Sequence, residues 1–356
     1  MVRTHTFTTN DDGSIFHYPR ALKTGTVMPG EKTVLTAFEV RRLEAADYLR
    51  LAEIYHSNDP EVNVTADEIR FDDETWDYKK YVLKQFVATI SGRVEGWAIY
   101  WQEPDMYHPQ KFSMNIAVDP LKQSLGLGSV LYAQILAELQ RLYAILVRCE
   151  IKENMIAGKA FLQHRGFVEI HRKWESHLQV AEFSAEPFKH YEERTASQQV
   201  KITTLLEEAK LDPDCYRKLH ELWFQKLGYD MPWPDTYTPI SFEDFMTRVV
   251  KGPGILPDGC FIAKVEGRYV GLSWSQKSEK EPNVLWQMIT GVLGEYRGRG
   301  IAVALKLRVI DFARRNGYDV VKTVNSSANK AMLGVNRKLG FRRHVGRITF
   351  QKPLNF

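Results

Sequence analysis

The most constraining feature of this sequence is a short glycine-containing segment that occurs twice. In the second half, Tyr296-Arg-Gly-Arg-Gly-Ile-Ala302 lies between an apolar run, Val284 to Val292, and an amphipathic helical pattern that begins near Ile301. In the first half, Gln123-Ser-Leu-Gly-Leu-Gly128 has the same arrangement. A strand, a glycine loop and a helix N-terminus together direct backbone N–H groups at an anion, so both segments are candidate diphosphate sites.

The two segments belong to a longer repeat. Arg297 follows Gln123 by 174 residues, and Gly340 follows Gly166 by the same number, each of these glycines preceding a phenylalanine. The apolar positions of the helix between these landmarks repeat too: Leu131, Ile135 and Leu139 correspond to Leu305, Val309 and Ala313. A spacing shared by three landmarks predicts a duplicated structural unit.

Two common phosphate-binding loops are excluded by the residues around the glycines. A P-loop requires a lysine and a Ser or Thr after its last glycine, and neither copy has them. A dinucleotide-binding fingerprint requires a third small residue, where the two copies have Val303 and Leu131.

The pattern Arg/Gln-x-x-Gly-x-Gly/Ala resembles the acyl-CoA loop of the GCN5-related N-acetyltransferase (GNAT) family. The run from Asn325 to Phe341, with its spaced asparagines and its Gly-Phe end, resembles the cofactor-side strand and following helix of that family. The resemblance covers most of the chain. It implies an α/β fold of two tandem domains, each a mixed, centrally splayed sheet flanked by helices, with acetyl-CoA as the acyl donor.

Length and local composition suggest where these domains lie. A chain of 356 residues is long enough for two domains. Residues 1–36 show no clear period and are expected to form an N-terminal arm. Residues 37–190 are expected to form a first, degenerate acetyltransferase-like domain and residues 191–356 a second, active one. The boundary is placed in the polar stretch from Phe183 to Gln199. Strands are expected near residues 38–43, 85–90, 95–101, 112–118, 144–151, 200–205, 284–292, 320–324 and 347–352, and a hairpin is expected over residues 261–274 with its turn at Glu266-Gly267.

The bulk composition excludes several classes of protein. A hydrophobic content of 44%, a charged content of 26% and a net charge of +4 suit a soluble globular protein without nucleic-acid partners. We expect no membrane association and no signal peptide, because no apolar run has the required length or position. The scattered Cys149, Cys215 and Cys260 predict neither a disulfide framework nor a metal site, which suits a cytoplasmic setting. The oligomeric state, monomer or homo-oligomer, stays open.

The resemblance implies a set of cofactor-binding residues in the second copy. The backbone amides would hold the pyrophosphate, with charge added by two arginine side chains, although a merely charged loop is the alternative. Val292 would face the thioester carbonyl, and Asn325 and Asn329 would lie beside the pantetheine arm, although Asn329 could simply cap a helix. The loop residues are Arg297, Gly298, Arg299, Gly300, Ile301 and Ala302. Their counterparts in the first copy are Val118, Gln123, Gly126 and Gly128.

The catalytic groups are less well specified. Many relatives carry a glutamate on the strand before the loop, but Val284 to Val292 contains no carboxylate. The position of the family's tyrosine acid holds Asn336 in the second copy and Leu162 in the first. Thr290 and Asn336 remain as candidates to orient water or substrate, with ordinary strand and helix polarity as the alternative.

The acceptor side offers two aromatic candidates. Trp233 and Tyr237 lie in a proline-rich stretch and could line a substrate pocket or serve only for packing. The resemblance implies direct acetyl transfer to a small-molecule or amino-terminal primary amine, catalysed by the second domain. Two alternatives stay open: a CoA-binding module without turnover, and an acyltransferase that uses a different acyl donor.

Overall fold

The computed structural model describes residues 16–18, 38–60, 64–252, 254–278 and 281–356. By its contacts the chain forms two compact units. The first comprises Met1–Gln102, Pro109–Val147 and Leu354–Phe356, and the second comprises Glu103–His108 and Arg148–Pro353. The predicted arm at 1–36 lies outside the described residues, apart from the short strand β1 (Phe16–Tyr18). The predicted division at residue 190 stays a prediction.

The first unit is an antiparallel sheet with a helix on each face. Its strands follow each other in space in chain order: β1, β2 (Phe38–Arg42), β3 (Leu83–Ile90), β4 (Arg93–Trp101) and β5 (Lys111–Val118). The helices are α1 (Tyr48–Asn58), α2 (Ala66–Glu74) and α3 (Leu127–Arg141). Trp97 packs with Leu51 of α1, whereas a Cβ on the adjacent Gly96 would meet Leu131 of α3. Successive residues of a strand point to opposite faces, so α1 and α3 cover opposite faces.

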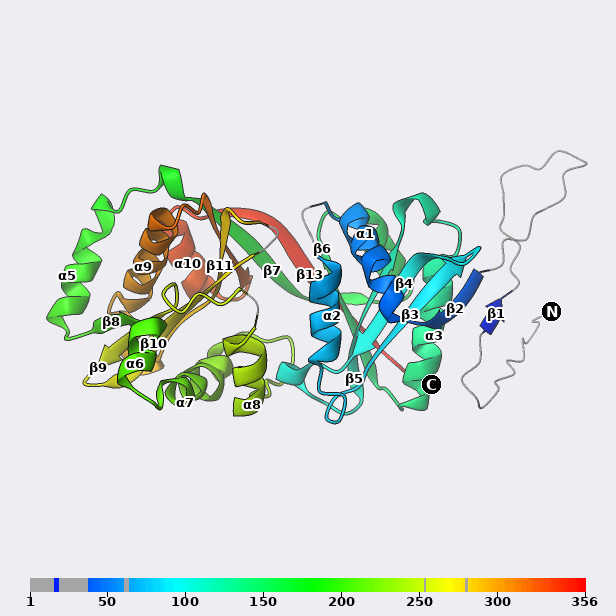
Figure 1. The fold of residues 1–356 in the computed structure, drawn as a ribbon, viewed down its shortest axis with the longest axis horizontal. Helices are drawn as coiled ribbons and strands as arrows, with labels where there is room; N and C mark the ends of the chain where they lie inside the picture. Colours follow the sequence, from blue (N-terminus) through cyan, green and yellow to red (C-terminus); the bar gives the residue numbers. More distant parts are fainter. Residues whose placement is uncertain (1–15, 19–37, 61–63, 253, 279–280) are drawn as a thin grey trace, which may run out of the picture. The chain divides into compact units, whose positions relative to one another are not determined.

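The second unit contains a mixed sheet (Figure 1). Across the sheet the strands are β6 (Leu146–Lys152), β13 (Arg342–Pro353), β7 (Val168–Gln179), β12 (Val320–Ser326), β11 (Val284–Val292), β10 (Arg268–Lys277), β9 (Phe261–Val265) and β8 (Lys201–Thr204). β11 and β12 are parallel, whereas β13, β7 and β12 are successively antiparallel.

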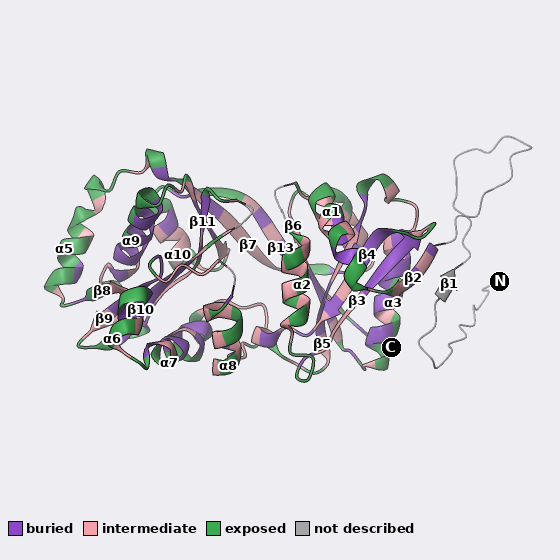
Figure 2. Cartoon of the chain, in the orientation of Figure 1, coloured by how far each residue is buried: buried purple, intermediate pink, exposed green. Residues whose placement is uncertain are grey.

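Helices cover both faces of this second sheet. The helices are α4 (Ile156–Gln163), α5 (Lys189–Ser197), α6 (Leu205–Leu211), α7 (Cys215–His220), α8 (Phe242–Asp244), α9 (Ile301–Arg315) and α10 (Lys330–Lys338). π-Helical turns extend α7 over Glu221–Lys226 and α8 over Phe245–Val250. Trp274 of β10 packs against Trp223 and Phe245, while a Cβ on Gly271 would meet Leu305 of α9. Figure 2 shows how much of α9 is buried.

The elements of the two repeats coincide at the offset of 174 residues. α3 and α9 have corresponding bounds, as do β6 and β12, and β7 and β13. β7 belongs to the first repeat, yet it lies between β12 and β13 of the second and pairs with both (Figure 1, green beside red). The sheet of the second unit is therefore completed by a strand from the other copy.

Two segments differ from the expectations. The polar stretch at 183–199, where the domain boundary is placed, contains a helix that was not expected, α5, which packs against α9. No strand was expected at β7, and β13 begins five residues earlier than the expected strand. Within the described residues, no helix combines the length and the apolar character that crossing a membrane requires.

Candidate functional site

The two central strands of the second unit part where the site is expected. β11 and β12 are paired only at three rungs, Val284 with Val320, Leu285 with Val321, and Trp286 with Lys322. Beyond Trp286, β11 continues to Val292 and β12 to Ser326 without pairing. Beyond this rung, the facing backbone edges of β11 and β12 are not paired with each other and are available to a ligand. The predicted central splay of the sheet requires such unpaired edges.

A β-bulge in β11 coincides with the end of this pairing. Trp274 is opposite Ile289 and Ser275 is opposite Gln287, so Met288 is the extra residue. A bulge bends a strand and re-aims its side chains, which accounts for the divergence of β11 from β12. The equivalent β5 runs against β4 in unbroken register. The bulge of the second repeat is thus not reproduced in the first.

The two glycine loops share one backbone conformation. Gly298 and Gly300 have φ values of 74° and 90°, and their counterparts Ser124 and Gly126 have 62° and 99°. Each loop follows a 3-10 turn, Gly294–Tyr296 or Pro120–Lys122, and leads directly into α9 or α3. Left-handed φ is costly for serine, so its retention at Ser124 shows that the chain imposes this loop shape in both copies.

The loop and the first turn of α9 present free amides. In the described part of the chain, no backbone or side-chain acceptor takes the N–H groups of residues 298–302. Ile301 and Ala302 are the first residues of α9, and Gly128 is the second residue of α3, so their amides are among those that a helix leaves unpaired. Converging amides and the helix dipole together favour an anion at this end of α9.

Arg297 and Gln123 hold their loops in the same way. The Nε of Arg297 donates to the carbonyl oxygen of Val292 over 3.0 Å, and the Nε2 of Gln123 donates to that of Val118 over 3.3 Å. Arg297 is also paired with Asp230 at 2.5 Å. Both predicted residues therefore tie the end of the preceding strand to the loop. The guanidinium of Arg297 is therefore engaged within its own chain, by the carbonyl oxygen of Val292 and the carboxylate of Asp230.

The loop of the second repeat is held by residues of α5 and the segment after it, and among the described residues the loop of the first repeat lacks this support. Arg194 at the end of α5 donates to the carbonyl oxygen of Gly298 over 2.8 Å, and Gln198 donates to that of Arg299 over 3.3 Å. A Cβ on Gly300 would lie 2.8 Å from the ring of Tyr191, whereas one on Gly126 would meet nothing within 4 Å. α5 thus covers the carbonyl side of the loop and leaves its amides unpaired.

The three predicted asparagines have different roles. The side chain of Asn329 accepts from the amide of Met332 over 3.1 Å and so caps α10, which was the simpler of its two readings. Asn336 donates to Asn325 over 2.7 Å. Asn336 is 2% exposed, and its own Oδ1 is among the buried side-chain atoms without a partner. A buried acceptor without a donor is costly, so a donor from a ligand would fit here.

Thr290 belongs to a buried polar chain that the sequence did not reveal. Its hydroxyl lies 2.9 Å from that of Ser273, which accepts from Gln287 over 2.8 Å, and Gln287 accepts from the ammonium of Lys306. Lys306 is 1% exposed, and burial lowers its pKa to about 7. The sequence does place Lys306 on the apolar face of α9, which could have indicated the buried chain. It does not indicate that Gln287 is the residue that Lys306 contacts.

The two aromatic candidates pack against the chain beneath them. Trp233 and Tyr237 stack with their ring centroids 5.1 Å apart. Trp233 donates to the carbonyl oxygen of Gly228 over 2.7 Å and Tyr237 to that of Phe224 over 3.1 Å. These contacts favour the packing reading, and a role in binding substrate stays a prediction.

Comparison with known proteins supports the predicted family. The model of the Acetyltransferase (GNAT) family matches residues 214–341, which include β11, the loop and α9. The N-acetylaspartate synthetase of Xenopus tropicalis is 36% identical over 91 residues, 25% of this chain and 33% of its own length. The matched region therefore spans about a third of that relative.

Solved structures match nearly the whole chain. A GCN5-related N-acetyltransferase from Sphaerobacter thermophilus has a TM-score of 0.64 and 17% identity, with 89% of this chain and 95% of that chain covered. A tandem GNAT protein from the clavulanic acid biosynthesis pathway has a TM-score of 0.66 and 16% identity, with 89% and 98% covered. At these identities the likeness shows the fold, and it confirms the predicted tandem α/β architecture.

Proposed function

We propose that the second repeat, in which residues 214–341 match the model of the Acetyltransferase (GNAT) family, transfers an acetyl group from acetyl-CoA to a primary amine. The acceptor is a small molecule or an amino terminus, and the transfer is direct, with no covalent enzyme intermediate. The N-acetylaspartate synthetase named among the relatives supports an amine acceptor, because its product carries the acetyl group on an amino acid.

One observation carries the proposal. A loop of unpaired amides at the start of α9 directly follows a strand that parts from its parallel neighbour. The amides of residues 298–302 would hold the pyrophosphate, with Arg299 adding charge. The backbone edges of β11 and β12 beyond Trp286 would receive the pantetheine arm, and the unpartnered Oδ1 of Asn336 would accept from one of its amides. The bound donor would supply the thioester carbonyl that the amine attacks.

The first repeat is better suited to a supporting role. Its loop has the same backbone shape, but β5 lacks the bulge and Leu162 is buried at 3% exposure. We propose that it serves as a structural or cofactor-binding partner. We also keep the cytoplasmic setting as a prediction, supported by three cysteines that are all unpaired.

Two measurements test the proposal. Titration calorimetry with acetyl-CoA is expected to show binding, and release of free thiol is expected with at least one member of a panel of primary amines, including acidic amino acids. A second candidate is a CoA-binding module without turnover, favoured because β11 carries no carboxylate. Acetyl-CoA binding without thiol release over the whole panel would support that module. Thiol release only with longer acyl donors would show that the donor is not acetyl-CoA.

The thiol assay should be free of background from the protein. Cys149, Cys215 and Cys260 are all buried, and burial raises the pKa of all three thiols, to about 12 for Cys149 and Cys260. Thiolates are the reactive form, so we expect almost no reaction of the native protein with a disulfide reagent at pH 8 within minutes. Three thiols per chain should react after denaturation. A fast-reacting thiol in the native protein would contradict the described burial.

A further inference from the structure

The strand exchanged between the repeats places a carboxylate–imidazole pair beside the point where β11 and β12 part. His177 of β7 is opposite Lys322 of β12, and Lys322 is opposite Trp286 at the last paired rung of β11. Directly paired residues point to the same face of a sheet, and neighbouring strands lie about 4.8 Å apart. The side chain of His177 therefore lies two strands from the parting of β11 and on the same face as Trp286.

The imidazole of His177 is held on two sides. Its Nε2 lies 2.6 Å from Oε1 of Glu175, two residues earlier on the same strand. The ring of His344 from β13 stacks on it with centroids 4.2 Å apart and an interplanar angle of 15°. In the described residues Nδ1 of His177 makes no hydrogen bond. A ring oriented by a carboxylate, with its second nitrogen uncommitted, is arranged to accept a proton.

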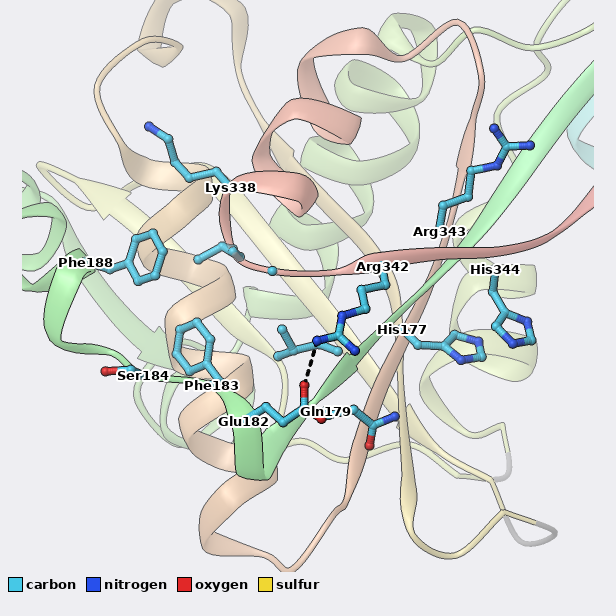
Figure 3. A pocket seen from close by; sticks show the side chains of 13 residues that line it. His177, Gln179, Glu182, Phe183, Ser184, Phe188, Lys338, Arg342, Arg343 and His344 are labelled. Atoms are coloured by element: carbon cyan, nitrogen blue, oxygen red, sulfur yellow. Dashed lines mark hydrogen bonds and ion pairs between the residues drawn. The ribbon is translucent and has the colours of Figure 1, made fainter.

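A pocket gives an acceptor molecule access to this ring. It has a volume of about 430 Å³, and His177 and His344 form one side of it (Figure 3). The charged groups that share the pocket are already engaged: Arg342 is paired with Glu182 at 3.0 Å, Arg343 lies over the ring of Trp174, and Lys338 donates to Tyr191. His177 thus lines a cavity large enough for a small amine and is also opposite Lys322, which forms the last rung shared by β11 and β12.

We propose that His177 is the general base of the acetyl transfer and that Glu175 is its positioning residue. This inference rests on the proposed function. The ammonium of the acceptor gives one proton to Nδ1 of His177, which passes it to water. The neutral nitrogen attacks the thioester carbonyl and forms the C–N bond. As the C–S bond breaks, the second proton leaves the nitrogen and protonates the departing thiolate. The products are an amide, a thiol and one proton in water.

The surrounding charges keep the carboxylate of Glu175 ionised. Glu175, on the same strand, is ionised: burial raises the pKa of its carboxyl, but the hydrogen bond to His177 and the charges of His177, Lys322 and Arg347 outweigh burial and lower it. Lys322 is itself paired with Glu281. The carboxylate of Glu175 holds the imidazole in place through its contact with Nε2 of His177, so its removal should lower kcat for the amine and leave KM unchanged.

The same three side chains, Glu175, His177 and His344, bring potential ligand atoms within 4.8 Å of one another. Lys322 and Arg347 act on the same carboxylate, and nearby positive charge opposes a divalent cation. Proton transfer is therefore the use that the surroundings favour. A metal ion is the competing outcome of the experiment.

The test compares His177→Gln and Glu175→Gln with His164→Gln, a matched change at an exposed histidine at the end of α4. We expect His177→Gln to lower kcat/KM for the amine about 100-fold at pH 7. Partial recovery is expected at high pH, where more of the amine is neutral. Glu175→Gln should lower kcat and leave KM for the amine unchanged, and His164→Gln should change neither quantity. Calorimetry should give all three variants the acetyl-CoA affinity of the unsubstituted protein, which also confirms that they fold.

Several outcomes would overturn this inference. If kcat/KM of His177→Gln lies within threefold of that of the unsubstituted protein, His177 is not the general base. Loss of activity in EDTA that is restored by Zn²⁺ assigns the three side chains to a metal instead. Absence of thiol release by the unsubstituted protein with every amine rejects the transfer itself and this inference with it. Loss of acetyl-CoA binding would instead contradict the donor site, so the two failures are distinguishable.

Discussion

Replacing Gly300 by tryptophan is expected to weaken acetyl-CoA binding at least about 100-fold and to abolish thiol release. Gly300 has a φ of 90°, which side chains rarely adopt, and its Cβ would lie 2.8 Å from the ring of Tyr191. The substitution therefore displaces α5 or the loop and disperses the amides that would hold the pyrophosphate. Calorimetry measures the affinity, and circular dichroism shows whether the fold is retained.

Gly126→Trp is the matched control, because Gly126 has the equivalent φ of 99° and no atoms within 4 Å of a Cβ. If the second repeat holds the donor used in catalysis, Gly126→Trp should retain thiol release. Arg299→Glu provides a milder variant without a steric clash, expected to weaken binding about tenfold by adding a negative charge near the phosphates. A folded Gly300→Trp protein with full affinity, together with a Gly126→Trp protein without it, would move the site to the first repeat.

Lys306 is expected to make the protein less stable at neutral pH than at alkaline pH. Its pKa is about 7 in the folded chain because of burial, against an ordinary value of 10.5 in the unfolded chain. Below pH 7 Lys306 is protonated in both the folded and the unfolded chain, so the full free-energy cost of burying its charge lowers the stability of the folded chain. Between pH 7 and 10.5 the unfolded state binds more protons, so this contribution to the free energy of unfolding rises with pH by about 1.4 kcal/mol per unit.

Replacing Lys306 by methionine should remove this dependence. The variant should gain stability at pH 6, by on the order of a few kcal/mol, since the lost penalty exceeds the cost of leaving Gln287 without its donor. The advantage should shrink by about 1.4 kcal/mol per pH unit above 7. Urea unfolding at pH 6, 8 and 9.5 measures the difference between the two proteins. Lys330→Met, at an exposed position of α10, is the control. A difference that stays constant from pH 6 to pH 9.5 would show that Lys306 stays charged in the folded chain over this range.

The repeat was predictable because it depends on local patterns. The left-handed backbone of the loop favours glycine, found in both copies at Gly126 and Gly300, and the helix that follows has a clear apolar period, so both signals are visible in the sequence. Their shared offset located α3 and α9 at corresponding bounds in the structure. The loop and helix of the second copy lie within residues 214–341, the stretch that the family model matches.

The missing elements carry no comparable signal. β7 reads Val-Glu-Ile-His-Arg-Lys-Trp-Glu-Ser-His-Leu-Gln, and most of its residues are polar because only part of one face is buried. α5 is polar because just Thr195 is buried among its residues, so it reads as a linker. The pair Glu175 and His177 was missed with its strand. Its stacking partner His344 lies on a strand far along the chain, and only tertiary pairing brings them together.

The position of β7 has a consequence for how the two copies can exist. A polypeptide severed between them would leave the carboxyl-terminal fragment with a slot between β12 and β13, where backbone donors and acceptors on both sides would face solvent. Such a fragment would tend to aggregate through its open edges. The second copy therefore depends on the first for a complete sheet, so the first cannot be removed even if it has no chemistry of its own.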